Sequence, residues 1–129
     1  MINHHGGIGL VIGFAFIASG ILKADIAYAE QERITDLATL ERVVVGRQLE
    51  TRSGKVRILV EPHGKLVGFL DNKKITGKWE FRDQQFCRSF RVGTGRGEME
   101  CQIMSYDENG VTVIRASGQG TRVKYRFAD

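Results

Sequence analysis

Beyond Gly46 the chain alternates polar and apolar residues in short segments, and turn-forming residues such as Asp71-Asn72 separate one segment from the next. Regular spacing with short connections is typical of an up-and-down antiparallel meander. The pattern therefore predicts a mainly β fold, a small antiparallel barrel or sandwich of seven to eight strands. The predicted strands span residues 47–50, 55–61, 65–70, 75–82, 85–92, 99–106, 111–116 and 122–127.

A helical period precedes the strands. Apolar residues recur there at the spacing of one helix face, and Thr35 or Asp36 can cap the first turn. Gly46 follows the last apolar position, as is common just after a helix end. We therefore expect one short helix over residues 36–45, before the first strand. The apolar residues that mark its face are Leu37, Leu40 and Val44.

Alternation within each strand assigns one set of side chains to the core and the other set to solvent. The solvent faces carry most of the basic residues, and Leu59 lies on such a face. Trp79 shares its side with apolar neighbours, so it is expected in the core rather than as an exposed stacking platform. The residues predicted to face the core on three strands are Val56, Ile58, Val60, Ile75, Gly77, Trp79, Phe81, Val123, Tyr125 and Phe127.

The N-terminal segment has the pattern of a secretory signal peptide. Residues 8–22 carry no charged side chain, and the small-x-small sequence Ala27-Tyr28-Ala29 follows. A retained membrane anchor is the alternative, but a spanning helix needs about 20 apolar residues and this run is shorter. We expect residues 1–29 to be a signal peptide that is cleaved. Residues 30–129 then form a single β domain with a short N-terminal helix, a monomer in the periplasm or secreted.

The chain has two cysteines, Cys87 and Cys101, both in the predicted mature domain. Glycines between them favour a hairpin that turns near Thr94 and sets the cysteines opposite each other. In an oxidising compartment this arrangement predicts a disulfide bond. His63 is the remaining Cys/His ligand of the mature chain, which is too few for a Cys/His metal site, so neither a metal nor a cofactor is expected.

The cysteine hairpin also places polar residues at core-facing positions. If Phe86 and Phe90 belong to the core, Arg88 between them points inward as well, and the cysteines lie on the outer face. In the opposite register the cysteines are inside and two large aromatic side chains are exposed, which is unfavourable. The inward residues of the partner strand in the favoured register are Glu100, Gln102, Met104 and Tyr106.

An inward Arg88 has two interpretations. A buried guanidinium needs hydrogen-bond acceptors, and Glu100 or Gln102 can supply them in a satisfied polar network. Alternatively, Arg88 anchors a small anionic ligand in a pocket whose walls are Trp79 and Tyr106. These five residues are the candidate ligand-binding site.

The predicted mature domain keeps the net charge of +4, because the signal peptide removes Lys23 and Asp25 together. Three basic residues alternate on the last strand, Arg122, Lys124 and Arg126, and could contact an anionic polymer. Nucleic acid binding is nevertheless not expected, since neither interleaved exposed aromatic residues nor a groove-sized helix is recognisable. The glycine-rich turn of the cysteine hairpin lacks the helix that a phosphate-binding loop requires. No catalytic Ser, His and carboxylate arrangement is recognisable either.

A series of short motifs runs through the last fifty residues: Gly77-Lys78-Trp79, Phe86-Cys87-Arg88, Glu100-Cys101-Gln102, Gly118-Gln119-Gly120 and Tyr125-Arg126-Phe127. The order of these motifs resembles a family of small exported bacterial proteins of unknown function. Some members of this family are labelled dihydrodipicolinate reductase. That enzyme has a glycine-rich βαβ entry and a catalytic His-His-x-x-Lys segment, whereas the only His-His pair here, His4-His5, lies in the signal peptide. The resemblance therefore implies an exported β domain and not a reductase.

The sequence thus offers a scaffold without convergent catalytic groups, which favours a non-enzymatic exported binding module. The expected partner is a small anionic molecule or another protein of the cell envelope. An alternative is a barrel that binds or inhibits another protein, by distant analogy with small secreted inhibitors of bacterial metalloproteases; a small enzyme is a third interpretation. An internal cavity would favour a small ligand, whereas exposed apolar side chains would favour a larger partner.

Overall fold

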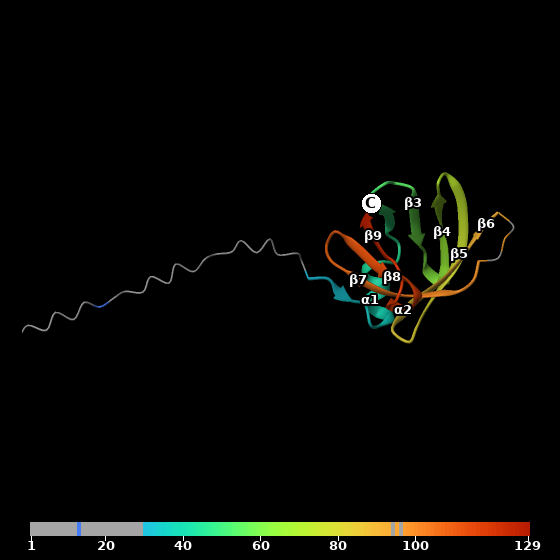
Figure 1. The fold of residues 1–129 in the computed structure, drawn as a ribbon. Helices are drawn as coiled ribbons and strands as arrows, with labels where there is room; N and C mark the ends of the chain where they lie inside the picture. The colour runs from blue at the N-terminus through green and yellow to red at the C-terminus, as the bar shows by residue number, and fades with distance from the viewer. Residues whose placement is uncertain (1–12, 14–29, 94, 96) are drawn as a thin grey trace, which may run out of the picture.

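The computed structural model describes residues 13, 30–93, 95 and 97–129, so the signal-peptide prediction and Thr94 fall outside the described residues. The described chain is mainly β with a short N-terminal helix, as predicted (Figure 1). The helical segments are α1 (Leu37–Val43), η1 (Pro62–Gly64) and α2 (Arg115–Gly118). The strands are β1 (Glu32–Arg33), β2 (Gln48–Thr51), β3 (Val56–Val60), β4 (Lys65–Leu70), β5 (Lys73–Arg82), β6 (Gln85–Val92), β7 (Glu100–Tyr106), β8 (Gly110–Ile114) and β9 (Arg122–Phe127).

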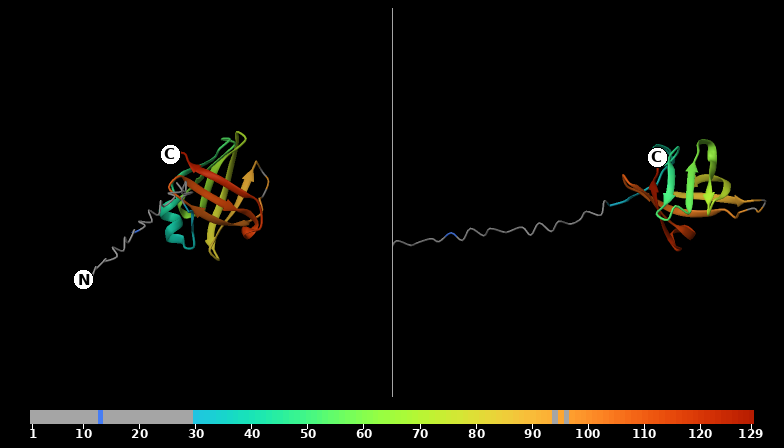
Figure 2. Two further views of the ribbon diagram at one scale, coloured as in Figure 1. Left: turned by 60° about the vertical axis from the view of Figure 1, so that its left-hand side comes forward. Right: turned by 90° about the horizontal axis from the view of Figure 1, so that it is seen from above.

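Strands β2 to β9 close into an antiparallel up-and-down barrel. Each of these strands pairs with the next one along the chain, and β9 returns to β2, where Leu49 lies opposite Phe127. Figure 2 shows the strands curling into this ring. Of the two predicted architectures, the barrel is therefore the observed one. Closure gives each of the eight strands a partner strand on both sides, so the barrel lacks the two edge strands of an open sheet.

A ninth strand, β1, was not predicted. It pairs with the end of β7, where Glu32 lies opposite Tyr106 and Arg33 opposite Ser105. The neighbouring strand β6 pairs only with the beginning of β7, so β1 occupies the edge that β6 leaves free. A strand of two residues is too short to show a period of two in the sequence.

Strand boundaries follow the predicted alternation closely, and β4, β6 and β9 match the predicted ranges. The main difference is β8, which was expected to continue to Ala116 but ends at Ile114. Ala116 and Ser117 have φ values of 50° and 54°, in the left-handed region that a strand cannot accommodate. Arg115 therefore lies in a compact turn rather than in the barrel sheet.

Helix α1 begins as the sequence predicts. Its N-cap is Asp36, whose carboxylate accepts a hydrogen bond from the Thr39 amide at 2.7 Å. Leu40 and Val44 are fully buried in the same core cluster as the barrel residues, so α1 packs against the barrel (Figure 2). Leu37 was expected on this buried face but is 44% exposed, because the first turn extends past the core.

The predicted core face is confirmed on several strands. Ile58, Val60 and Ile75 are buried, and the bulk of the core lies where α1 meets the barrel interior. The largest fully buried side chains are Ile34, Leu40, Leu66, Met104, Val44, Val60, Val111 and Cys87.

The cysteine hairpin has the predicted register. Cys87 lies directly opposite Cys101, and their sulfurs form a disulfide with the two Cα atoms 3.9 Å apart. Arg88 lies opposite Glu100 in the next pair, so it shares its side of the sheet with Phe86 and Phe90. The register with inward cysteines is therefore wrong.

Candidate functional site

Arg88 lines the interior of the barrel, as the alternation predicts. The small cavity there is lined by Arg88 and by core residues of seven strands, and its volume is about 20 Å³. The Arg88 guanidinium carbon lies 4.1 Å from the centre of the Phe90 ring, a cation–π contact. A space of this size holds about one water molecule. The barrel interior therefore has no room for the small anionic ligand that the sequence suggested.

The predicted partner of Arg88 is already bound by another arginine. Arg115 donates two hydrogen bonds to the Glu100 carboxylate, from Nε at 2.8 Å and from Nη2 at 2.7 Å. Gln102 donates a third, to Glu100 Oε1 at 3.2 Å. Among the described residues Arg88 makes neither an ion pair nor a side-chain hydrogen bond. The expectation that Glu100 or Gln102 holds Arg88 is therefore wrong.

The electrostatics of this cluster follow from those contacts. The Arg115 hydrogen bonds lower the pKa of the Glu100 carboxyl from 4.5 to about 2. Burial lowers the pKa of the Arg88 guanidinium, and the nearby Glu100 charge opposes that change. Burial also raises the pKa of the Tyr125 phenol, against the effect of Arg88 and Arg115. Glu100 with its low pKa is a weak proton acceptor at neutral pH.

Trp79 and Tyr106 do not form the walls of a pocket at Arg88. Trp79 is a core residue, as predicted: it is 8% exposed, and its ring stacks on Phe86 with centroids 5.9 Å apart. Its Nε1 donates to the Glu61 carbonyl oxygen at 2.8 Å. Tyr106 is the last residue of β7, and its hydroxyl donates to the Glu32 carboxylate at 2.8 Å. About 20 Å of strand separates Tyr106 from the beginning of β7, so it cannot contact a ligand at Arg88.

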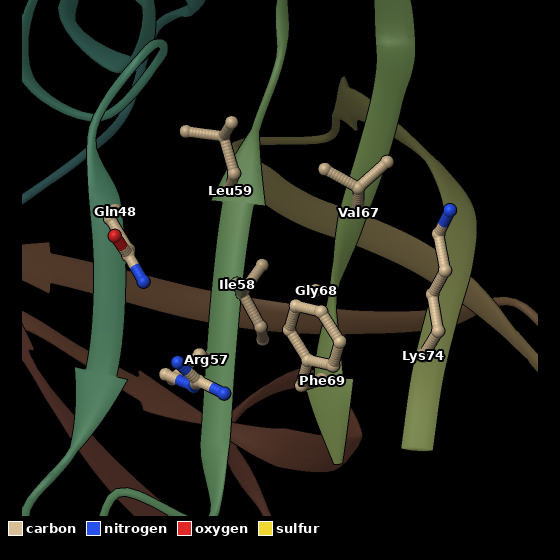
Figure 3. Close-up of a pocket in the computed structure, with 8 residues that line it drawn as sticks. All are labelled: Gln48, Arg57, Ile58, Leu59, Val67, Gly68, Phe69 and Lys74. Carbon is tan, nitrogen blue, oxygen red and sulfur yellow. The ribbon is translucent and has the colours of Figure 1, made fainter. Parts of the chain in front are cut away.

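A larger concave site lies on the outside of the barrel. We call the outward side chains of β2 to β6 the outer wall. Strands β2 to β5 form a depression of about 350 Å³ in this wall, which we call the apolar depression (Figure 3). Its volume is within the range of small-molecule sites. It is lined by Gln48, Arg57, Ile58, Leu59, Val67, Gly68, Phe69 and Lys74.

The strand register explains how these residues meet. Leu59 lies opposite Val67, and the two form the apolar centre of the depression. Phe69 lies between Arg57 on one neighbouring strand and Lys74 on the other, as Figure 3 shows. The Arg57 guanidinium carbon is 5.0 Å from the centre of the Phe69 ring. An exposed phenylalanine therefore stands between two cations on the surface of the barrel.

Gly68 shapes the bottom of this depression. A Cβ atom at Gly68 would overlap the carbonyl oxygen of Arg57 on the adjacent strand. Glycine at such a position lets two strands approach more closely than side chains allow. The close approach brings the outward side chains of β3 and β4 together around the apolar centre.

A second depression adjoins the first across β5, and we call it the basic depression. Lys78 and Arg91 supply its charge and Ser89 a hydroxyl, and the linings of the two depressions contain no acidic residue. Lys74 of the first and Thr76 of the second are alternate residues of the same strand face. The residues that line the basic depression are Thr76, Gly77, Lys78, Ser89, Arg91 and Gly97.

Sequence reasoning placed Leu59 on the solvent face but did not recognise a site there. The available signal was the segment Leu66-Val67-Gly68-Phe69-Leu70, in which apolar residues occupy both faces of one strand. A strand with one solvated face is expected to alternate, so apolar residues on its outer face indicate contact with something else.

No protein-family model, no curated protein and no solved structure matches the chain. Within the described residues, no group of three or more His, Cys, Asp or Glu side chains could hold a metal ion. None of the helices in that part of the chain is long and apolar enough to cross a membrane.

Proposed function

We propose that this chain is a non-enzymatic, exported binding module that holds its ligand on the outer wall rather than inside the barrel. The observation that carries this proposal is the difference in available space. The interior offers about 20 Å³, whereas the apolar depression offers about 350 Å³ and is lined by exposed apolar and cationic side chains. Of these two places, the apolar depression can hold more than a water molecule and the interior cavity cannot.

The chemistry of the outer wall supports a binding role. Phe69 near the end of β4 is 41% exposed, and the half-buried Leu59 and Val67 extend the apolar surface beside it. Burying apolar groups against a partner is favourable because it removes them from water, so their clustering around a depression indicates a binding surface.

The interior cluster supports a non-enzymatic role. Its one carboxylate, Glu100, is held by Arg115 and has a pKa of about 2, far from the range of an efficient general base. Burial raises the pKa of the nearby Tyr125 phenol, away from neutrality, so this group does not replace Glu100 as a base. The cavity beside them excludes a substrate by size.

Export is supported by the signal-like N-terminal sequence together with the Cys87–Cys101 bridge, because structural disulfides persist mainly in oxidising compartments. Fractionation of the producing cell, followed by mass spectrometry of the intact chain, tests this part of the proposal. We expect the chain outside the cytoplasm, beginning at Glu30, with both thiols oxidised. Recovery of a full-length reduced chain from the cytoplasm would contradict it.

A photo-reactive amino acid tests the binding surface without a known ligand. Benzoylphenylalanine at Val67 places the reactive group in the apolar depression, and the same residue at Lys124 of β9 serves as the control. We expect cross-links to a cellular component from position 67 and not from position 124. Cross-links from neither position, or equally from both, would rule out the outer wall as the binding surface. The mass of the adduct also separates a protein partner, including a protease, from a small molecule.

A further inference from the structure

We infer that the partner of the outer wall is an anionic lipid surface. This inference rests on the proposed function, since it assigns a ligand class to the same wall. It is based on three features of the described residues: unpaired cations, an exposed apolar centre, and the absence of groups that other classes of ligand would require.

The cations that line the two depressions have no acidic partners, although farther along the outer face of β5 Arg82 pairs with Glu80. The four ion pairs among the described residues involve Arg47, Arg82, Arg115 and Arg126, and none involves a cation of the two depressions. Lys65 even lies directly opposite Lys78 across β4 and β5, an arrangement of like charges that destabilises a sheet. An anionic partner would relieve this repulsion. The unpaired cations are Arg57, Lys65, Lys74, Lys78 and Arg91.

The apolar residues lie where a lipid surface would receive them. Phe69, near the end of β4, is 41% exposed on the outer face and lies opposite Lys74. Lipid headgroups carry the negative charge at the surface, and the apolar layer lies just beneath them. Aromatic side chains flanked by Lys and Arg suit this boundary, where the ring enters the interface and the cations meet the headgroups.

An extended acidic peptide fits this wall less well. The apolar depression lies on a sheet face where β3 and β4 are paired with neighbours on both sides, so it offers side chains and no free strand edge. A peptide laid over Leu59 and Val67 would leave its own backbone amides and carbonyls unpaired against an apolar surface, which is costly.

A nucleic acid also fits less well. Proteins that bind single strands usually stack successive bases on several exposed aromatic side chains. Phe69 is the one aromatic residue among those that line the two depressions, and the Arg57 guanidinium already lies over its ring. The wall therefore has cations for phosphates but no series of platforms for bases.

Vesicle co-sedimentation of the exported chain tests this inference. We use vesicles of phosphatidylcholine with about one-third phosphatidylglycerol, and vesicles of pure phosphatidylcholine. Binding is expected to the anionic vesicles and to fall steeply with added salt. The double variant Lys74→Gln, Lys78→Gln should lower the partition coefficient roughly 30-fold at low salt, because each basic residue near an anionic surface contributes about a fivefold factor.

A matched control distinguishes the effect of the outer wall's cations from the effect of net charge alone. Arg122→Gln with Lys124→Gln removes the same charge from β9, which lies four strands from β5 in either direction around the barrel. This pair should leave the partition coefficient within about twofold of the original chain. Phe69→Ser should lower the partition coefficient several-fold at every salt concentration, because the variant loses an apolar contact that salt does not screen.

Failure of this inference is distinguishable from failure of the proposed function. Absence of vesicle binding, or an equal loss in both double variants, overturns the lipid assignment. If short RNA or an acidic peptide binds instead and Lys74→Gln, Lys78→Gln weakens it, the lipid assignment is also overturned while the outer wall remains the binding surface. Absence of cross-links specific to position 67 would overturn both the lipid assignment and the proposed binding function of the outer wall.

Discussion

Two arginines and one carboxylate share the same part of the barrel, and their contacts decide what each can do. Arg115 holds Glu100 through two hydrogen bonds, while Arg88 lies over Phe90 without a charged partner of its own. Arg88 is half-buried, and a partly desolvated cation without a paired acceptor contributes little to stability while it keeps a desolvation cost. Replacement of Arg88 by an apolar side chain of similar length is therefore expected to be tolerated.

We predict that Arg88→Met changes the free energy of unfolding by less than about 1 kcal/mol, in either direction. Urea denaturation measures this value. The matched variant Arg115→Met should be the more harmful of the two, because it leaves the Glu100 carboxylate without its partner. A loss above about 3 kcal/mol for Arg88→Met would show that Arg88 is strongly paired in the folded state.

Glu100 gives the domain a predictable response to acid. Its pKa is about 2 in the folded protein against 4.5 as its ordinary value, so the unfolded chain takes up the proton first. The stability that this carboxylate contributes is therefore fully present above about pH 4.5 and is lost as the pH falls toward 2. Thermal unfolding followed between pH 2 and 6 should show a smaller acid-induced decrease for Glu100→Gln than for the original chain. An unchanged pH dependence in the variant would contradict the Arg115–Glu100 pair.

Sequence alternation was sufficient to place Arg88 inward but not to identify the partner of Glu100. The direction of a side chain depends on the period of its own strand, which the flanking Phe86 and Phe90 reveal. Arg115 instead reaches Glu100 from a turn whose next residues, Ala116 and Ser117, are left-handed. Alanine and serine rarely adopt this conformation, so no sequence signal indicated that β8 would end there.

Among the elements, the β6–β7 hairpin is fixed by the disulfide between its strands. The bridge joins residues 14 apart, and closing a loop of this length stabilises a domain by about 3 kcal/mol in the chain-entropy model. We predict that the double variant Cys87→Ala, Cys101→Ala loses about that much stability and still folds. Guanidinium denaturation of the variant, beside the oxidised and reduced original chain, checks this. Equal stability of all three forms would contradict the prediction.

The β5 strand contributes the single tryptophan of the chain to the core. Trp79→Ala removes a large buried ring, its stacking on Phe86 and its hydrogen bond to Glu61, so we predict a loss of about 3 to 5 kcal/mol. Native Trp79 should emit at short wavelength and resist quenching by iodide. Red-shifted emission that iodide quenches fully would contradict its burial.

The elements that showed a clear period were predicted well, and those without one were not. Strands β4, β6 and β9 each have at least six residues, which is long enough for alternation to mark both ends. Strand β1 has two residues and forms because β7 has a free edge there, a tertiary effect that local sequence does not record.

For the whole molecule, barrel closure determines where a ligand can lie. The interior is filled by core side chains and leaves about 20 Å³, so the binding residues expected there have no room for a ligand. The sequence could not reveal this, because it shows which side chains face inward but not how completely they fill the space. The outer wall became visible only when the register placed Phe69 between Arg57 and Lys74.

Amide chemical shifts recorded while anionic bicelles are added test most directly whether the ligand binds the outer wall or the barrel interior. We predict changes concentrated at outward residues of β3 to β5, with Phe69 and Lys74 among the largest, and little change at Lys124 on the far side of the barrel. Changes concentrated instead at Arg88 and Tyr125 would contradict an outer binding surface and return the site to the interior.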